Sequence, residues 1–295
     1  MNPFDLYGPQ FLVFYAVLAI AICFIVAALR RMAEPSEWGG GLQPGGTMAD
    51  PYLIASLRGG KNEVIRTAII SLADRKLLDV SGENLQTSEV GAKTTTRKPI
   101  ETALLLKCRQ KVEAKSLFTA KELDAATDDY ERQLTAHRLL PDGGIRTMRG
   151  LIYFVAIAVL LAVSGRKIWV ALDRGRHNVG LLIIFTVVAL VFTAKAAFPR
   201  TTAAGKNFLK EVRNLFQALK LRAAQIHPGG QSNEVALLVA VFGVTALSGD
   251  AFGWTKLLFP KAASSSSSSC GSSCGSSCGS SCGGGCGGGC GGCGG

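Results

Sequence analysis

Hydrophobic and polar positions alternate in long blocks along the chain, and the first apolar block predicts a membrane-spanning helix over residues 11–29. Its 19 residues carry no charge. At ~1.5 Å per residue the helix is about 28 Å long, close to the thickness of a bilayer's hydrocarbon core. Arg30 and Arg31 follow it, whereas a secretory signal has its basic residues before the apolar core. We therefore expect an uncleaved anchor with the N-terminus outside and both arginines in the cytoplasm.

Two further apolar blocks, residues 151–172 and 179–198, predict a membrane hairpin. The first of them is interrupted by Arg166 and Lys167, whose long side chains can reach the membrane surface from near the helix end. The apolar segment 235–249 has only fifteen residues, which is short for a span. It is consistent with a fourth span, a re-entrant segment or an interfacial helix, and we favour a segment that does not cross.

Residues 203–224, between the hairpin and this last segment, predict a basic amphipathic helix. Apolar residues recur at helical spacing, and lysines and arginines occupy much of the rest; the apolar set is Phe208, Val212, Leu215, Phe216 and Leu219. Such a helix either lies on an anionic lipid leaflet or packs its apolar face on a soluble domain, and the sequence leaves both open.

Residues 49–148 predict a soluble helical module in the cytoplasm, joined to the first span by a glycine-rich linker over residues 32–48. The pattern predicts one helix that is stopped by Gly59 and Gly60. A second helix follows, with an apolar face made of Val64, Ile65, Ala68, Ile69 and Leu72.

Short polar motifs predict where the later elements of the module begin. The sequence SGEN at 81–84 lies between two apolar stretches and predicts a short hairpin. Pro99 predicts the first turn of a helix. Thr119 and Glu122 have the spacing of a capping box and predict the start of another helix.

The sequence SLADRKLLDVSG at residue 71 is echoed by QLTAHRLLPDGG at residue 133, an offset of 62 positions. The match predicts two related helical units, each ending on two leucines and a turn. A helix followed by a short hairpin is typical of winged-helix-like units, which bind DNA or proteins, and the neutral charge favours proteins. A packing repeat without a ligand is the favoured explanation of the echo. We therefore predict a mostly α fold: a multi-span integral membrane protein with a small helical, winged-helix-like cytoplasmic module and a disordered C-terminal tail.

The positive charge of the chain is confined to the parts outside the central block. The formal net charge is +11, from 32 basic and 21 acidic residues, but residues 32–148 contain 16 of each and are neutral. The excess therefore flanks the apolar segments, as in membrane proteins that contact anionic lipid. Because a nucleic-acid-binding protein would carry the excess on its folded domain, we expect the lipid bilayer and protein partners rather than nucleic acid.

Residues 262–295 consist almost only of Ala, Ser, Gly and Cys, and they predict a disordered tail because they include no large apolar side chain. The tail carries seven cysteines at close spacing, namely Cys270, Cys274, Cys278, Cys282, Cys286, Cys290 and Cys293. Thiolates are ligands of zinc and Cu(I), so these seven residues are the candidate metal ligands and zinc or copper the candidate cofactor. Only the last two have the C-x-x-C spacing common in zinc sites.

Three other uses of the tail remain open. Its small residues leave room for an enzyme to convert cysteines and serines into azole rings, as in modified precursor peptides. An odd number of thiols suits intermolecular disulfides if the tail lies outside the cell. A passive spacer is the simplest interpretation.

The sequence contains no recognisable catalytic motif. It has no nucleophile elbow, phosphate loop or dinucleotide-binding glycine pattern, and its three histidines form no metal-binding pair. Four acids cluster in a helical stretch, which is typical of a solvated face; they are Asp124, Asp128, Asp129 and Glu131. We therefore predict that the protein is not an enzyme, and we identify no small-molecule substrate.

Several features occur together in a fixed order: LRGG at 57–60, A-x-x-x-L-A-D-R-K-L-L at 68–78, a membrane hairpin with the turn GRK…RGRH, and a Gly/Cys tail. Over roughly residues 5–260 and in the style of its tail, the chain resembles a TIGR-series family of uncharacterised bacterial membrane proteins that end in Gly-, Ser- or Cys-rich tails. The resemblance implies a multi-pass protein of the bacterial inner membrane. It implies no activity and no catalytic residues.

These patterns favour a membrane-anchored interaction or scaffold protein whose cysteine-rich tail binds a soft metal or a partner. A precursor with a modified tail is the first alternative. A membrane-tethered regulator that uses a winged-helix-like module is the second.

Overall fold

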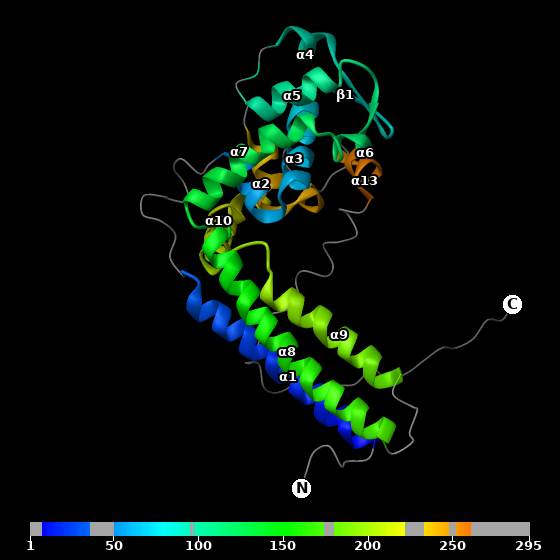
Figure 1. Cartoon of the computed structure of the whole chain (residues 1–295). Coiled ribbons are helices and arrows are strands. Elements are labelled where there is room, and N and C mark those ends of the chain that lie inside the picture. The colour runs from blue at the N-terminus through cyan, green and yellow to red at the C-terminus, as the bar shows by residue number, and fades with distance from the viewer. Residues whose placement is uncertain are drawn as a thin grey trace, which may run out of the picture.

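The computed structural model describes residues 8–35, 50–94, 96, 98–173, 180–221, 233–247 and 252–260. Within these residues the chain is mostly helical, which confirms the predicted fold class at that level. Three long apolar helices form a bundle, and the remaining elements form a helical module at one end of it (Figure 1).

The apolar bundle consists of α1 (Gly8–Ala33), α8 (Gly143–Asp173) and α9 (Gly180–Ala197). Each of the three is long and apolar enough to cross a membrane, and within the described residues no other helix is. Helix α8 continues without a break through Arg166 and Lys167, and the ammonium of Lys167 lies 4.6 Å from the centre of the Phe11 ring. The two cations therefore do not end the helix.

The packing of the bundle differs from that of a soluble protein, because many of its largest apolar side chains point outward. Phe24, Phe154 and Phe192 are among the exposed ones. The buried positions of α8 and α9 instead include small residues and hydroxyls, namely Ala156, Ser164, Thr186, Ala189, Thr193 and Ala197. Small residues bring helix backbones close together, and apolar exteriors suit a lipid environment.

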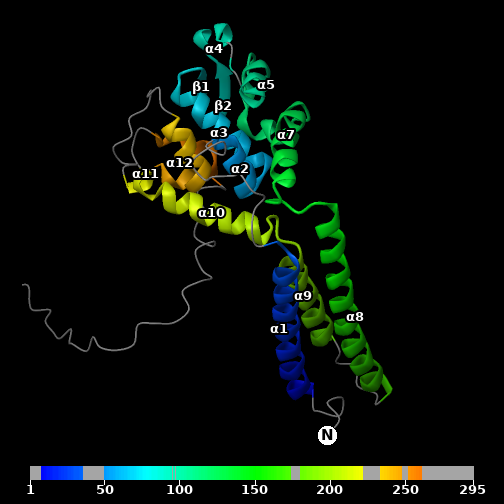
Figure 2. The same ribbon diagram turned by 90° about the vertical axis from the view of Figure 1, so that its left-hand side faces the viewer.

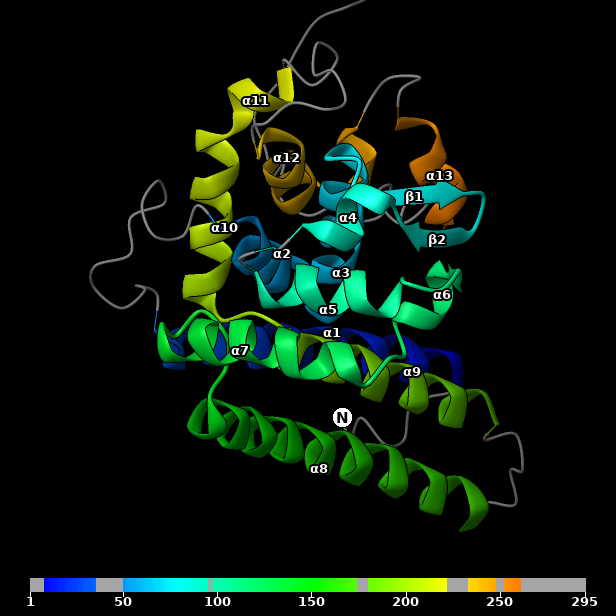
Figure 3. The ribbon, with the colours of Figure 1, turned by 90° about the horizontal axis from the view of Figure 1, so that it is seen from above.

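The centre of the module is a pair of helices, α2 (Pro51–Gly59) and α3 (Lys61–Asp74). Asp50 caps α2 by accepting a hydrogen bond from the amide of Tyr52, and Pro51 occupies the first turn. Gly60 ends the helix in the left-handed region, at a φ of 73°, as predicted. The predicted apolar face of α3 is fully buried, and Figure 3 shows both helices surrounded by the other elements of the module.

The next elements form a small antiparallel sheet and its flanking helices. The predicted hairpin is present, with β1 (Leu78–Ser81) paired to β2 (Asn84–Thr87), and β2 in turn to β3 (Val112–Glu113). The flanking helices are α4 (Glu89–Lys93), α5 (Pro99–Lys107), α6 (Ala114–Leu117) and α7 (Glu122–Ala136).

The predicted capping box at α7 is wrong. Lys121, not Thr119, stands at the N-cap position, and no side chain caps the helix there. The hydroxyl of Thr119 instead donates to the carbonyl of Ser116, because the chain makes a further short turn before α7 begins.

The module is completed by elements that follow the α8–α9 hairpin in sequence. They are α10 (Ala203–Leu215), α11 (Gln217–Leu221), α12 (Glu234–Phe242), the 3₁₀ helix η4 (Val244–Ala246) and α13 (Trp254–Leu258). Residues of α10, α12 and α13 share one hydrophobic core with α2 and α3. The predicted module boundaries of 49–148 are therefore too narrow.

Helix α12 corrects the prediction for the apolar segment 235–249. The segment was expected to be a fourth span, a re-entrant segment or an interfacial helix, with a segment that does not cross favoured. Its nine-residue helix instead lies against α2 and α3, with most of its side chains buried in the module core. At ~1.5 Å per residue it is about 14 Å long, far too short to cross a bilayer. An apolar run of this length is the signature of a buried core helix as well as of a membrane segment.

The sequence echo at an offset of 62 corresponds to a repeated turn. Two residues after the last residue of α3 and of α7, the backbone is left-handed, at Lys76 with a φ of 57° and at Arg138 with a φ of 60°. The leucine after each one donates its amide to a carbonyl five residues back, Leu77 to Leu72 at 2.9 Å and Leu139 to Leu134 at 3.0 Å. This hydrogen bond is the mark of a Schellman helix end, so the echo encodes a helix terminus.

The repetition extends to a capped helix that packs on each turn. The hydroxyl of Ser88 donates to the carbonyl of Lys76 and accepts from the amide of Gly91, both in the first unit. In the second unit, the hydroxyl of Thr202 likewise donates to the carbonyl of Arg138 and accepts from the amide three residues on. Between turn and cap the first unit has the β1–β2 hairpin, and the second has the α8–α9 hairpin. The apolar hairpin therefore occupies the place of a β-hairpin in a duplicated unit.

Candidate functional site

The candidate site is the junction where the three bundle helices meet the module (Figure 2). Glu34, just after α1, lies against Arg149 in the second turn of α8. Its carboxylate accepts hydrogen bonds from the guanidinium of Arg149 at 2.8 and 2.6 Å, and it lies 3.5 Å from the guanidinium of Arg30. The side chains of Glu34 and Arg149 are 0% and 2% exposed. The junction therefore contains a buried ion cluster.

This cluster also holds the connection between α9 and α10. The second oxygen of Glu34 accepts from the amide of Ala203, the first residue of α10, at 2.9 Å. Arg149 donates to the carbonyls of Pro199 at 2.7 Å and of Thr201 at 3.4 Å. One carboxylate and one guanidinium thus link the end of α1, the start of α8 and the start of α10. Buried charges are tolerated when they are paired and hydrogen-bonded in this way.

Arg200 connects the same region to the turn of the LRGG motif. Its guanidinium lies 2.6 Å from the carboxylate of Glu131 and 3.4 Å from the carbonyl of Ser56. It also lies so close to Gly60 that a Cβ there would overlap it. Gly60 therefore serves two needs, its positive φ and the approach of Arg200.

Arg58 of the same motif has a different role inside the module. Its guanidinium donates to the carbonyl of Val239 at 2.6 Å and pairs with Glu63. The carbonyl belongs to the last turn of α12, so Arg58 fixes that helix against α2. Burial lowers the pKa of the Arg58 guanidinium, and the neighbouring Glu63 opposes this shift.

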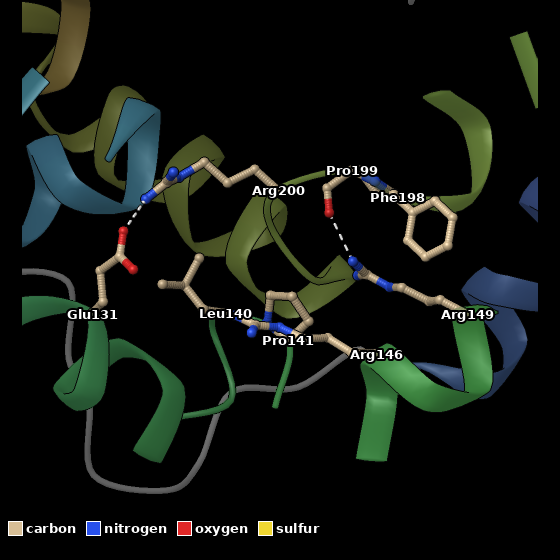
Figure 4. A pocket seen from close by; sticks show the side chains of 8 residues that line it. All are labelled: Glu131, Leu140, Pro141, Arg146, Arg149, Phe198, Pro199 and Arg200. Atoms are coloured by element: carbon tan, nitrogen blue, oxygen red, sulfur yellow. Dashed lines mark hydrogen bonds and ion pairs between the residues drawn. The ribbon is translucent and has the colours of Figure 1, made fainter. Parts of the chain in front are cut away.

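A pocket of about 270 Å³ opens at the junction (Figure 4). It is lined by three arginines, one carboxylate and several apolar residues, namely Arg146, Arg149, Arg200, Glu131, Leu140, Pro141, Phe198 and Pro199. Burial and the nearby Arg30 and Arg31 lower the pKa of the Lys206 ammonium beside this junction. The region thus has a positive potential, which favours the binding of anions.

Helix α10 crosses the bundle-facing end of the module. Its apolar face packs on α2 and α12, so the second of the two predicted placements describes the structure. The predicted helix over 203–224 is interrupted at Phe216, where α10 ends. The exposed residues Lys206, Lys210 and Arg213 leave a basic face outward. In Figure 2 this helix is the element of the module nearest the bundle helices.

A second buried polar cluster lies inside the module. The hydroxyl of Tyr52 and the guanidinium of Arg75 each lie 2.5 Å from the same oxygen of Glu101. Burial and the neighbouring Glu101 raise the pKa of Tyr52 well above its usual value. Among the described residues, the nearby hydroxyl of Tyr130 has no hydrogen-bond partner. The shared carboxylate of Glu101 holds α2 and the end of α3 against α5.

The seven tail cysteines predicted as metal ligands, Cys270 to Cys293, lie outside the described residues. Within the described part of the chain, no group of three or more His, Cys, Asp or Glu side chains is placed to hold a metal ion. The acidic side chains of α7 are largely exposed to solvent, as predicted, and three of them also form ion pairs. Asp124 pairs with Lys61, Asp129 with Arg132 and Glu131 with Arg200.

Sequence reasoning missed the residues of the junction. Arg30 was interpreted only as a topology signal, and Glu34, Arg149 and Arg200 were not selected. One signal was present, since Glu34 is an acid placed four residues after Arg30 at the end of an apolar segment. No family model, no curated protein and no solved structure matches this chain.

Proposed function

We propose that the protein is a multi-pass membrane protein of the bacterial inner membrane that presents a helical module at the cytoplasmic surface and acts as an interaction or scaffold protein, not as an enzyme. The observation that carries this proposal is the buried Glu34–Arg149 cluster. It ties all three apolar helices to the module through contacts that a tether of flexible linkers would lack. A module held in this way keeps one orientation toward the bilayer.

The path of the chain supports a single side for the module and the tail. If α1, α8 and α9 all cross, their module ends lie on one side of the bilayer. Leu258 and Phe259 are buried in the module core, and the tail follows almost at once. The tail thiols then share the compartment of the module. In a reducing cytoplasm this favours metal thiolates over structural disulfides.

The tail is the proposed ligand-bearing part, with zinc or Cu(I) held by the seven cysteines. Thiolates at spacings of three and four residues can enclose a tetrahedral ion. Modification of the cysteines and serines into rings is the alternative. The two differ in the covalent mass of the purified chain, because ring formation removes atoms and metal binding does not.

The regulator that reads DNA through a winged-helix-like module is not favoured. In such a unit, α3, the helix before the β1–β2 hairpin, would be the recognition helix. However, α3 is buried on nearly all sides by the other elements. The equivalent helix of the second unit, α7, exposes an acidic face that would repel phosphate.

Thiol labelling tests the placement of the tail. We expect a membrane-impermeant maleimide to leave the chain unlabelled in intact cells and to label it in inverted membrane vesicles. Cys108 should stay unreactive in both, because burial raises its thiol pKa to about 11 and keeps it protonated at neutral pH. A variant with the seven tail cysteines replaced by serine is the control for the signal. Labelling of intact cells, or release of the protein by alkaline washing, would contradict the proposed arrangement.

Metal analysis tests the proposed role of the tail. We expect zinc or copper to co-purify with the full chain and to fall at least tenfold in the variant with seven Cys→Ser substitutions, since thiolates supply the ligands. Elemental analysis and the intact mass are measured on the same sample. Equal metal content in both proteins rules out metal binding by the tail, and a reduced covalent mass favours the modified precursor.

A further inference from the structure

The junction pocket combines surplus positive charge with an apolar rim. Of its three arginines, Arg149 is bonded to Glu34 and Arg200 to Glu131. Arg146 is exposed and forms no ion pair or side-chain hydrogen bond with another described residue. Glu34 is also shared with Arg30, so these two carboxylates face four guanidiniums and leave a surplus of two positive charges. An anion bound in the pocket would offset part of this surplus.

The pocket lies at the height where the apolar surface of the bundle begins. Arg149 is followed after one residue by Leu151, the first of the exposed apolar residues along α8. On α9 the boundary is Phe198, which is 47% exposed and packs edge-on against Tyr153 at a ring distance of 5.2 Å. Tyrosine and tryptophan collect at the level of lipid headgroups, and Tyr153 lies at this boundary. An anion in this pocket would therefore lie at headgroup depth if the bundle spans the membrane.

We propose that the junction pocket binds the phosphate of an anionic phospholipid of the membrane in which the bundle sits. This inference rests on the proposed function, because it needs the three helices to cross a bilayer. The planar guanidinium of Arg146 offers paired donors that match phosphate oxygens, and Arg149 and Arg200 line the same pocket (Figure 4). The acyl chains would lie on the apolar surfaces of α8 and α9.

The exposed arginine makes the proposal testable without disturbing the fold. Arg146→Gln removes the unpaired cation and leaves the buried cluster intact. Arg109→Gln is the matched control, since Arg109 is exposed, does not line the pocket and forms no ion pair or side-chain hydrogen bond with another described residue. Both variants remove one positive charge, so a general loss of electrostatic attraction would affect them equally.

The test uses the purified full chain, stripped of lipid in detergent and titrated with phosphatidylglycerol or phosphatidylcholine, with bound lipid counted by native mass spectrometry. We expect the native chain to prefer phosphatidylglycerol. Arg146→Gln should lower the affinity for phosphatidylglycerol about tenfold, which corresponds to the loss of one charge-assisted hydrogen bond. Arg109→Gln should leave this affinity unchanged. Arg146→Lys should retain part of the affinity, since it keeps the charge and loses the paired donors.

Three outcomes would overturn the proposal. The first is equal weakening of phosphatidylglycerol binding by Arg146→Gln and Arg109→Gln, and the second is equal binding of both lipids by the native chain. The third is displacement of phosphatidylglycerol by millimolar inorganic phosphate, which would make a free anion the ligand. Extraction of the same proteins with alkaline buffer reports membrane insertion separately. A chain that is inserted but shows no lipid preference refutes the lipid site alone, whereas a chain released from the membrane refutes the proposed function as well.

Discussion

Glu34→Ala is expected to lower the free energy of unfolding by about 3–5 kcal/mol, the usual cost of removing one partner from a buried ion pair. Glu34 is the only carboxylate that pairs with Arg30 and Arg149 among the described residues. Its loss leaves two guanidiniums without a counter-charge and also leaves the amide of Ala203 without its acceptor. Among the described residues, the Nε of Arg30 already has no hydrogen-bond acceptor, so no second acceptor replaces the lost carboxylate.

The measurement is the thermal unfolding of the full chain in detergent, followed by helical signal and by protease sensitivity of the junction. Glu34→Gln keeps the shape of the side chain but not its charge. Its unfolding temperature should lie between those of the native chain and Glu34→Ala. Glu131→Gln removes a carboxylate of the same region from a pair whose side chains are 42% and 41% exposed. It should cost less than about 1 kcal/mol, because solvent screens such a pair. Similar effects of the Glu34 and Glu131 variants would show that the cluster does not hold the junction.

The features predicted correctly from the sequence are those that depend on residues close to one another along the chain. The three apolar helices, the helix stop at Gly60 and the β1–β2 hairpin follow from local spacing and turn chemistry, and the structure has them. Contacts between residues that are far apart in the sequence leave no periodic pattern from which they could be predicted. Glu34 meets Arg149 and Ala203 from 115 and 169 residues away, so no periodicity connects them.

The elements that the sequence left open were those whose residues allow two environments. The residues of α12 are equally suited to a membrane and to a protein core, and only the packing of α2 and α3 against them decides the matter. The same holds for α10, whose apolar face has the spacing for either a leaflet or a soluble partner. In both cases the deciding partner is distant in sequence, which explains why the predicted module ended too early.

Gly205→Ala is the second substitution with a large expected effect, and it should lower the free energy of unfolding by about 1–3 kcal/mol. Gly205 lies in α10, which packs on the turn after α7. In an ordinary helix the same change stabilises, by up to about 1 kcal/mol. Here a Cβ would overlap the carbonyl oxygen of Leu139 in the Schellman turn, and a backbone atom cannot move aside as a side chain can. Gly91 meets the carbonyl of Leu77 in the same way, so Gly91→Ala should reproduce the effect in the first unit.

Gly150→Ala in α8 is the matched control, since a Cβ there meets no atom within 4 Å. It should leave the unfolding temperature unchanged or raise it, whereas the two substitutions at the turns should both lower it. The opposite signs separate close backbone approach from helix propensity, which favours alanine at all three positions. If Gly205→Ala stabilised the chain as Gly150→Ala does, the second unit would not pack on its turn as the first one does. The placement of the apolar hairpin within a duplicated unit would then lose its physical basis.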